Sequence, residues 1–147
     1  MNVASLAKDA GISVITANAW ISILEASFIL LRLPPYYKNF SKRVIKSPKI
    51  YFCDTGLLCN LLNIFNQEQL QKSGLRGAIF ENFVVTEYMK KALFKGEEPQ
   101  LYFWRDTNQN EVDLLCETDG ELSAIEIKSG ETKNQKFFHG HIALIAY

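Results

Sequence analysis

The pair Asp119-Gly120, set between two β-forming runs, constrains the fold of this 147-residue chain more than any other feature. The runs and the pair together read EVDLLCETDGELSAIEIK, residues 111–128. Asp-Gly between β-rich segments is typical of a two-residue type I′ turn, so the sequence predicts an antiparallel hairpin. Such a loop also fixes the register, because residues that face each other have numbers that sum to 119 + 120 = 239. Asp113 is therefore expected to face Glu126.

Strand alternation sorts the side chains of this hairpin into a charged face and an apolar face. The charged face, at the open end, carries Glu111, Asp113, Glu126 and Lys128. The apolar face carries Val112, Leu114, Cys116, Ile125 and Ile127. In this register Leu114 faces Ile125, and Glu111 faces Lys128. Charged groups cost several kcal/mol to bury unless they are paired or bind something, so the charged face calls for a ligand or a partner.

The facing carboxylates of Asp113 and Glu126 favour a bound cation. Side chains in facing positions lie about 5 Å apart, and two carboxylates at that distance repel by roughly 3 kcal/mol at an effective dielectric near 20. A cation between them, or a shared proton, removes this repulsion. Oxygen ligands suit a hard divalent ion such as Mg²⁺ or Mn²⁺, and Lys128 could orient a metal-activated water or stabilise charge. The alternative is an exposed charge ladder in which Lys128 pairs with Glu111.

The stretch RGAIFENFVVTEYMKKALF, residues 76–94, predicts a long helix. At about 100° per residue, Glu81 is the one acid on the apolar arc of this helix. A carboxylate on the buried side of a helix costs free energy unless it is paired or binds a ligand. Glu81 could supply a third oxygen to the cation.

The first part of the chain predicts a helix-turn-helix. Residues 3–10 form a short helix, Gly11 to Ser13 a tight turn with Ser13 as N-cap, and residues 14–30 a second helix with apolar residues, Phe28 among them, at helical spacing. Any short αα-hairpin would share this pattern. The second helix has no Lys or Arg for guanine edges, which argues against sequence-specific DNA reading.

A basic segment follows the two prolines that end this helix. Strand-like runs around Val44 and at 49–53 would suit the wing of a winged helix. The bases are Lys38, Lys42, Arg43, Lys46 and Lys49. With interleaved aromatic residues they favour contact with nucleic-acid phosphates, and a solvated hairpin is the alternative.

Asp54-Thr55-Gly56 has the sequence of an aspartic-protease site, but that chemistry needs two such carboxylates facing each other. The following LLCNLL favours a helix capped by Asp54 or Thr55. The polar residues 63–74 predict a linker between a winged-helix module (1–62) and an α/β module (75–147). The net charge is 8 − 4 = +4 over residues 1–75 and 8 − 12 = −4 over residues 76–147, which fits two modules with different roles.

The remaining features indicate the compartment in which the protein is expected to occur. Three cysteines without CxxC spacing favour reduced thiols in a cytoplasmic protein over a disulfide frame. The sequence has no signal peptide and no uninterrupted apolar span, so no membrane segment is expected. The end of the chain, HIALIAY, predicts a strand with nothing after it, which favours a fragment of a longer protein.

Glu81, Asp113 and Glu126-x-Lys128 together resemble the site of the PD-(D/E)XK nuclease superfamily, whose members hold Mg²⁺ with a helix acid, an Asp and a Glu-x-Lys. Four stretches also resemble a family of unknown function at the C-terminal end of bacterial and archaeal AAA-type ATPases, in which a winged helix precedes a nuclease-like domain. They are SPKIYFCDTGLL, RGAIFENFVVTEY, LYFWRDTNQNEVDLL and AIEIKSG. The resemblance covers most of residues 3–130. The superfamily's proline before the Asp is replaced by Val112.

The resemblance implies a winged-helix module followed by an incomplete restriction-endonuclease-like α/β domain. It implies a nucleic-acid-binding, Mg²⁺-dependent phosphodiesterase that works with an ATPase module. The chain has no GxxxxGK[ST] phosphate loop, so no nucleotide site is expected in it. Two alternatives stay open: a nuclease-like fold without chemistry that serves as a docking module, and a purely winged-helix regulator, which would leave the second half unexplained.

Overall fold

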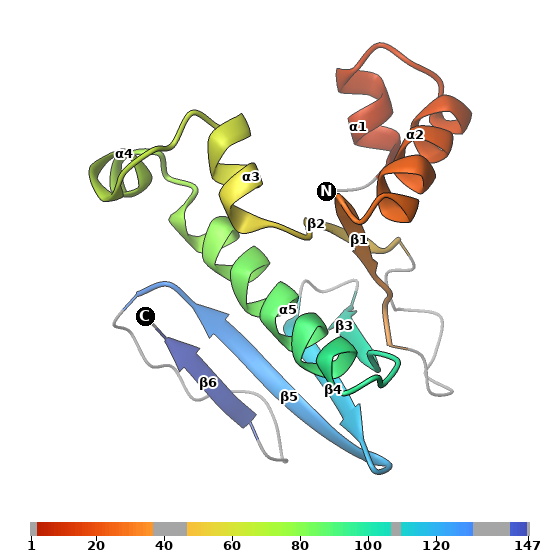
Figure 1. Cartoon of the computed structure of the whole chain (residues 1–147), viewed down its shortest axis with the longest axis vertical. Helices are drawn as coiled ribbons and strands as arrows, with labels where there is room; N and C mark the ends of the chain where they lie inside the picture. The colour runs from red at the N-terminus through yellow and green to blue at the C-terminus, as the bar shows by residue number, and fades with distance from the viewer. Residues whose placement is uncertain (1–2, 37–46, 107–109, 131–141, 147) are drawn as a thin grey trace.

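The computed structural model describes residues 3–36, 47–106 and 110–130, and the backbone of 142–146. It is a mixed α/β structure (Figure 1). The helices are α1 (Val3–Asp9), α2 (Val14–Ala26), α3 (Thr55–Leu61), α4 (Gln67–Lys72) and α5 (Arg76–Phe94). The strands are β1 (Leu30–Leu33), β2 (Lys49–Phe52), β3 (Leu101–Arg105), β4 (Glu111–Thr118), β5 (Glu121–Lys128) and β6 (Ile142–Ala146). No helix in the described ranges is both long enough and apolar enough to cross a membrane.

The strands form two sheets. The larger sheet has the order β3-β4-β5-β6, antiparallel except for the parallel pair β5–β6, and the smaller sheet pairs β1 with β2 antiparallel. Helix α5 lies along one face of the larger sheet, whereas α1 and α2 lie beyond the smaller sheet (Figure 1). The expected strand near the end of the chain is confirmed as β6.

The predicted hairpin is confirmed in both its turn and its register. Asp119 and Gly120 have φ angles of 54° and 79°. Positive φ at both central residues is what a type I′ turn requires. Strands β4 and β5 pair Leu114 with Ile125 and Thr118 with Glu121, as the two-residue loop dictates.

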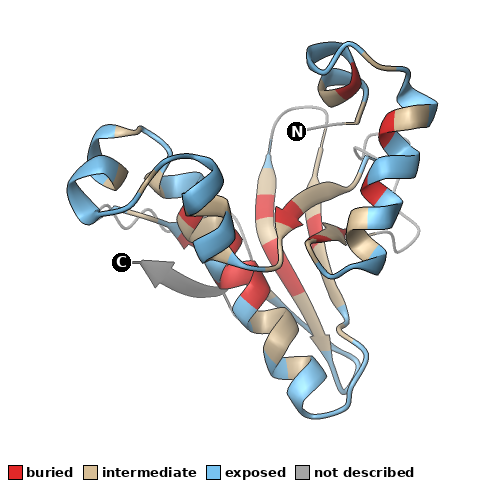
Figure 2. Cartoon of the chain, turned by 45° about the horizontal axis from the view of Figure 1, so that its top comes forward, coloured by how far each residue is buried: buried red, intermediate tan, exposed pale blue. Residues whose placement is uncertain are grey.

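The core joins parts of the chain that the sequence assigns to separate modules. Leu33 of β1 and Tyr51 of β2 are buried in the same cluster as Val84 and Val85 of α5 and Leu114 of β4. Figure 2 shows the buried residues concentrated where α5 meets the strands. The backbone N–H of Phe103 also donates to the carbonyl of Pro34, and the N–H of Tyr36 to the carbonyl of Phe103. The small sheet therefore packs against the second half of the chain.

The second helix is shorter than predicted. Helix α2 ends at Ala26, because Phe28 takes a φ of 55° and the N–H of Ile29 donates to the carbonyl of Leu24. This closing pattern, a Schellman motif, usually has glycine at the left-handed position, and with Phe28 there no local signal marks the end of the helix. Phe28 was expected on the apolar face of the helix but is 77% exposed. Residues 30–33 then form β1 instead of a last helical turn.

The stretch after β2 differs from the sequence expectation in one respect. Asp54 caps α3 as predicted, with its carboxylate accepting from the N–H of Leu57 at 2.5 Å. The expected linker, residues 63–74, contains helix α4, which Asn66 caps by accepting from the N–H of Gln69. The expected strand around Val44 lies outside the described residues.

Candidate active site

Asp113 of β4 is a partly buried acid with a raised pKa. Its Oδ2 atom accepts a hydrogen bond of 2.8 Å from the backbone N–H of Ile127, on the neighbouring strand. Burial raises the pKa of Asp113 to about 6, and the Glu81 and Glu126 carboxylates act in the same direction against the Ile127 bond and Lys49. The carboxylate of Asp113 on β4 therefore lies close enough to Glu81 of α5 and to Glu126 of β5 to be repelled by both.

Glu81 points inward from α5, as the helical arc predicts. One of its oxygens, Oε1, accepts from the Lys49 ammonium at 2.8 Å and from the Tyr51 hydroxyl at 2.5 Å. Both donors come from β2, where residues two apart lie on the same face of the strand. Among the described residues Oε2 of Glu81 makes no hydrogen bond or ion pair. Strand β2 thus fixes the position of this carboxylate.

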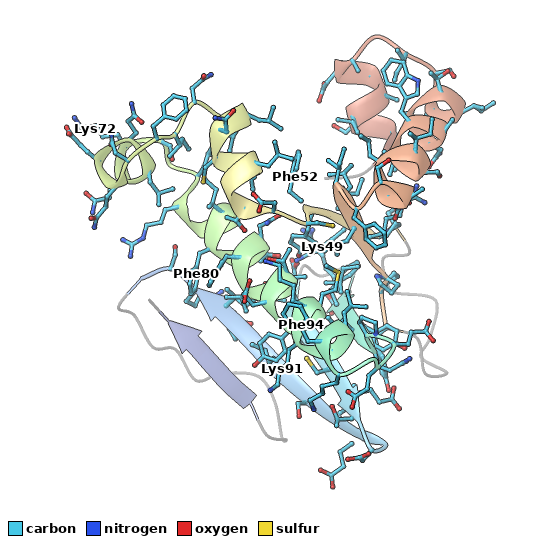
Figure 3. All side chains as sticks on the ribbon, viewed as in Figure 1. Lys49, Phe52, Lys72, Phe80, Lys91 and Phe94 are labelled. Carbon is cyan, nitrogen blue, oxygen red and sulfur yellow. The ribbon has the colours of Figure 1, made fainter. Side chains whose placement is uncertain are left out.

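Lys49 connects two acids of the site. Its Nζ atom lies 2.8 Å from Glu81 and 2.5 Å from Glu111, and Figure 3 shows the side chain where β2 approaches α5. Burial alone would lower the pKa of Lys49, but the two carboxylates outweigh burial and raise it. Glu111 is also 3.4 Å from the guanidinium of Arg105, its partner across β3 and β4.

Glu126 and Lys128 form the outer edge of the site. Their side chains make an ion pair of 2.5 Å, and the Lys128 side chain is half exposed. The hydrogen bond to Glu126 raises the pKa of Lys128, and the charges of Asp113 and Glu81 add to this effect. The Lys128 ammonium is therefore a stable positive charge at the solvent side of the acids.

Asn82 holds β2 against α5. Its amide oxygen accepts from the N–H of Phe52 at 2.8 Å, and its amide nitrogen donates to the Phe52 carbonyl at 3.0 Å and to the Thr55 hydroxyl at 3.2 Å. Asn82 is 3% exposed and adjoins Glu81 in the sequence. These bonds place Lys49 and Tyr51 within reach of Glu81.

The structure brings together the four acids and bases named from the sequence. The charges of Glu81 and Glu126 raise the pKa of Asp113. The charges of all three carboxylates raise the pKa of Lys128. The alternative from the sequence, a charge ladder in which Lys128 pairs with Glu111, is not among the ion pairs of the described residues: Glu111 pairs with Lys49, and Lys128 pairs with Glu126. We call the set of Lys49, Tyr51, Glu81, Glu111, Asp113, Glu126 and Lys128 the charged cluster.

The predicted phosphate-binding bases are only partly described. Lys38, Lys42, Arg43 and Lys46 lie outside the described residues. Lys49 is described and contacts carboxylates. Sequence reasoning missed this role of Lys49, and it missed Tyr51 and Asn82. The alternation of Lys49 and Tyr51 on β2 was the available signal that both point the same way.

The chemistry of the charged cluster suits a hard cation, although Glu81, Glu111 and Glu126 each already pair with a lysine. Carboxylate oxygens are the ligands that Mg²⁺ and Mn²⁺ prefer. The second oxygen of Asp113 makes no hydrogen bond or ion pair to the part of the chain that the structure describes. Within those residues no group of three or more His, Cys, Asp or Glu side chains is arranged to hold a metal ion.

Both halves of the chain match protein-family models. Residues 1–68 match a domain of unknown function, DUF8612, and residues 76–146 match another, DUF4143. The chain is 35% identical over 129 residues to the uncharacterized proteins Mb2031c of Mycobacterium bovis and Rv2008c of Mycobacterium tuberculosis. These matches cover 88% of this chain and 28% of each relative. No solved structure matches the chain.

These matches confirm the coarse resemblance drawn from the sequence, to domains of unknown function. The boundary between the two matches falls within residues 69–75, in the stretch that contains most of α4. The charged cluster draws on both matched regions, because Lys49 and Tyr51 lie in the first and Glu81, Asp113 and Glu126 in the second.

Proposed function

We propose that the charged cluster is a metal-dependent phosphodiesterase site of the nuclease type. The observation that carries the proposal is the position of Asp113, partly buried beside the carboxylates of Glu81 and Glu126, with a pKa of about 6. Charges of one sign gathered in a partly buried place are typical of sites that bind a cation or carry out proton chemistry. Lys128 beside Glu126 completes the set of groups that such a site needs.

Each residue of the site has a separate role in this proposal. Asp113 and Glu126 would hold the metal through carboxylate oxygens, and Glu81 would assist through Oε2. When bound, a divalent ion supplies polarisation of the phosphate and a more acidic water. Lys128 would orient the attacking water or stabilise negative charge near Glu126. Burial of Asp113 would keep its carboxylate away from bulk water.

The substrate in this proposal is a nucleic acid. Lys38, Lys42, Arg43 and Lys46 form a basic run with no acid among them, which suits phosphates along a backbone. Lys49 is not part of this surface in our proposal, because its ammonium is held by Glu81 and Glu111.

The chain would act as the C-terminal part of an AAA-type ATPase. The match of residues 76–146 supports this, since DUF4143 is associated with C-terminal regions of such ATPases. The relatives are much longer than this chain, which spans 28% of their length. Because the chain has no phosphate loop, nucleotide hydrolysis would belong to another part of the parent protein.

Cleavage of nucleic acid with Mg²⁺ or Mn²⁺ tests the proposal. Labelled single- and double-stranded DNA and RNA are incubated with the wild type, Asp113→Ala and Glu121→Gln. Glu121 is an exposed acid at the far end of β5 and serves as the matched control. We expect the first variant to lose cleavage at least about 100-fold and the control to retain it. Equal cleavage by the wild type and Asp113→Ala would remove Asp113 from the mechanism.

A docking module without chemistry is the second candidate. The observation that favours it is that three of the acids already have a cationic partner: Glu81 and Glu111 share Lys49, and Glu126 pairs with Lys128. A docking module should be indifferent to Mg²⁺ and Mn²⁺ in both stability and binding. Thermal unfolding with and without either ion separates the two candidates.

A further inference from the structure

Lys49 occupies a position that is unusual for a surface lysine. Its side chain is 19% exposed, less than that of either acid it contacts. It reaches two carboxylates from different elements, Glu81 on α5 and Glu111 on β4, and its ammonium lies 5.5 Å from the centre of the Phe103 ring. An ammonium that contacts two carboxylates offsets part of the negative charge of both.

The surroundings hold Lys49 in place. Tyr51, two residues along β2, donates to the same Glu81 oxygen, and Asn82 pins the backbone of Phe52 to α5. The position of β2 against α5 therefore places the Lys49 ammonium beside the carboxylates of Glu81 and Glu111. A divalent ion bound by Glu81 would lie close to this positive charge, and like charges repel strongly in a partly buried site.

We propose that Lys49 is a built-in counter-cation of the charged cluster, which stabilises Glu81 and Glu111 in the metal-free protein and competes with a divalent metal ion for the carboxylates. The inference rests on the proposed metal site and adds a residue from the first half of the chain that sets its metal affinity. Lys49 is thus a positioning residue, because it acts through Glu81 and not on a substrate.

Mn²⁺ binding by the wild type and Lys49→Gln tests this inference. Glutamine removes the charge and keeps a side-chain donor for Glu81. We expect the variant to bind Mn²⁺ about tenfold or more tightly by calorimetry. We also expect its Tm to be lower without metal and to rise more than that of the wild type when Mn²⁺ is added.

Two control variants separate the charge of Lys49 from other effects. Lys49→Arg keeps the positive charge and should bind Mn²⁺ as the wild type does, within about threefold. Lys72→Met removes a charge from the exposed Glu68–Lys72 pair of α4 (Figure 3), and should change neither Mn²⁺ affinity nor Tm.

The possible results distinguish this inference from the proposed function. If the wild type binds Mn²⁺ and Lys49→Gln binds it equally or more weakly, the counter-cation role is wrong and the metal site stands. If neither protein binds Mn²⁺, both the proposed function and the competition by Lys49 are overturned. If Lys49→Gln is unfolded without metal, refolding on addition of Mn²⁺ supports the inference, and failure to refold overturns it.

Discussion

The carboxylate of Asp113 on β4 is joined to the backbone N–H of Ile127 on β5 by a hydrogen bond of 2.8 Å. This bond holds the carboxylate next to the strand that carries Glu126 and Lys128. A hydrogen bond to the charged form favours ionisation, yet burial and the carboxylates of Glu81 and Glu126 prevail and keep the pKa near 6. The metal-free protein therefore has an ionised Asp113 at neutral pH at a cost in stability.

Replacing Asp113 with Asn should stabilise the metal-free protein at neutral pH. The folded-state pKa of about 6 lies above the ordinary value of 3.8, so the protonated form is favoured by folding. The stability that Asp113 contributes is fully present below about pH 4 and is lost as the pH rises through 6. Asparagine can still accept from Ile127, and we expect the free energy of unfolding to rise by roughly 1–3 kcal/mol at pH 7.5.

Denaturant unfolding of both proteins in chelator, at several pH values from 4 to 7.5, measures this difference. The gain from Asp113→Asn should shrink as the pH falls below 6. Glu121→Gln, which removes an exposed acid from the same strand pair, should give a small change at every pH. A wild type that is equally or more stable than Asp113→Asn at pH 7.5 would contradict the assigned environment of Asp113.

Asn82→Ala should be strongly destabilising. The change leaves the N–H and carbonyl of Phe52 without their side-chain partner in a partly buried place. We expect the free energy of unfolding to fall by roughly 2–4 kcal/mol, because unpaired buried polar groups keep their desolvation cost. Asn60→Ala, an exposed position on α3, should change it by less than about 0.5 kcal/mol. Similar values for the two variants would mean that Asn82 does not anchor β2.

Gly120→Ala should weaken the β4–β5 hairpin. Gly120 has a φ of 79°, which an alanine adopts only with strain, although nothing lies within 4 Å of an added Cβ. The expected loss is about 1 kcal/mol in the free energy of unfolding. Gly77→Ala in α5, where an added Cβ would lie 3.4 Å from the Ser129 hydroxyl, should be neutral or stabilising. The ranking of the two Tm values checks the prediction, and a reversed order would argue against the type I′ turn.

The elements whose signals are local could be predicted from the sequence. The apolar pattern of residues 76–94 gives α5 with both of its ends, and Asp119-Gly120 gives the hairpin and its register. The inward position of Glu81 follows from the same helical arc. These predictions succeed because residues a few positions apart determine them.

The contacts of Lys49, Tyr51 and Asn82 could not be predicted in the same way. They join β2 to α5 across 30 to 32 residues, and no local pattern specifies which side chains meet over that separation. Phe28 shows the other kind of failure, because a left-handed residue without glycine ended α2 early. The core that β1 and β2 share with α5 likewise depends on contacts between distant parts of the chain.

The central claim is that Asp113 and Glu126 hold a divalent metal ion, and calorimetric titration of Mg²⁺ and Mn²⁺ at pH 7.5 tests it most directly. The proteins compared are the wild type, Asp113→Asn with Glu126→Gln, and the exposed control Glu121→Gln. We predict one site in the wild type and the control, and a loss of affinity of at least about 100-fold in the double variant. Absence of binding in a folded wild type, or equal binding by the double variant, would contradict the metal site.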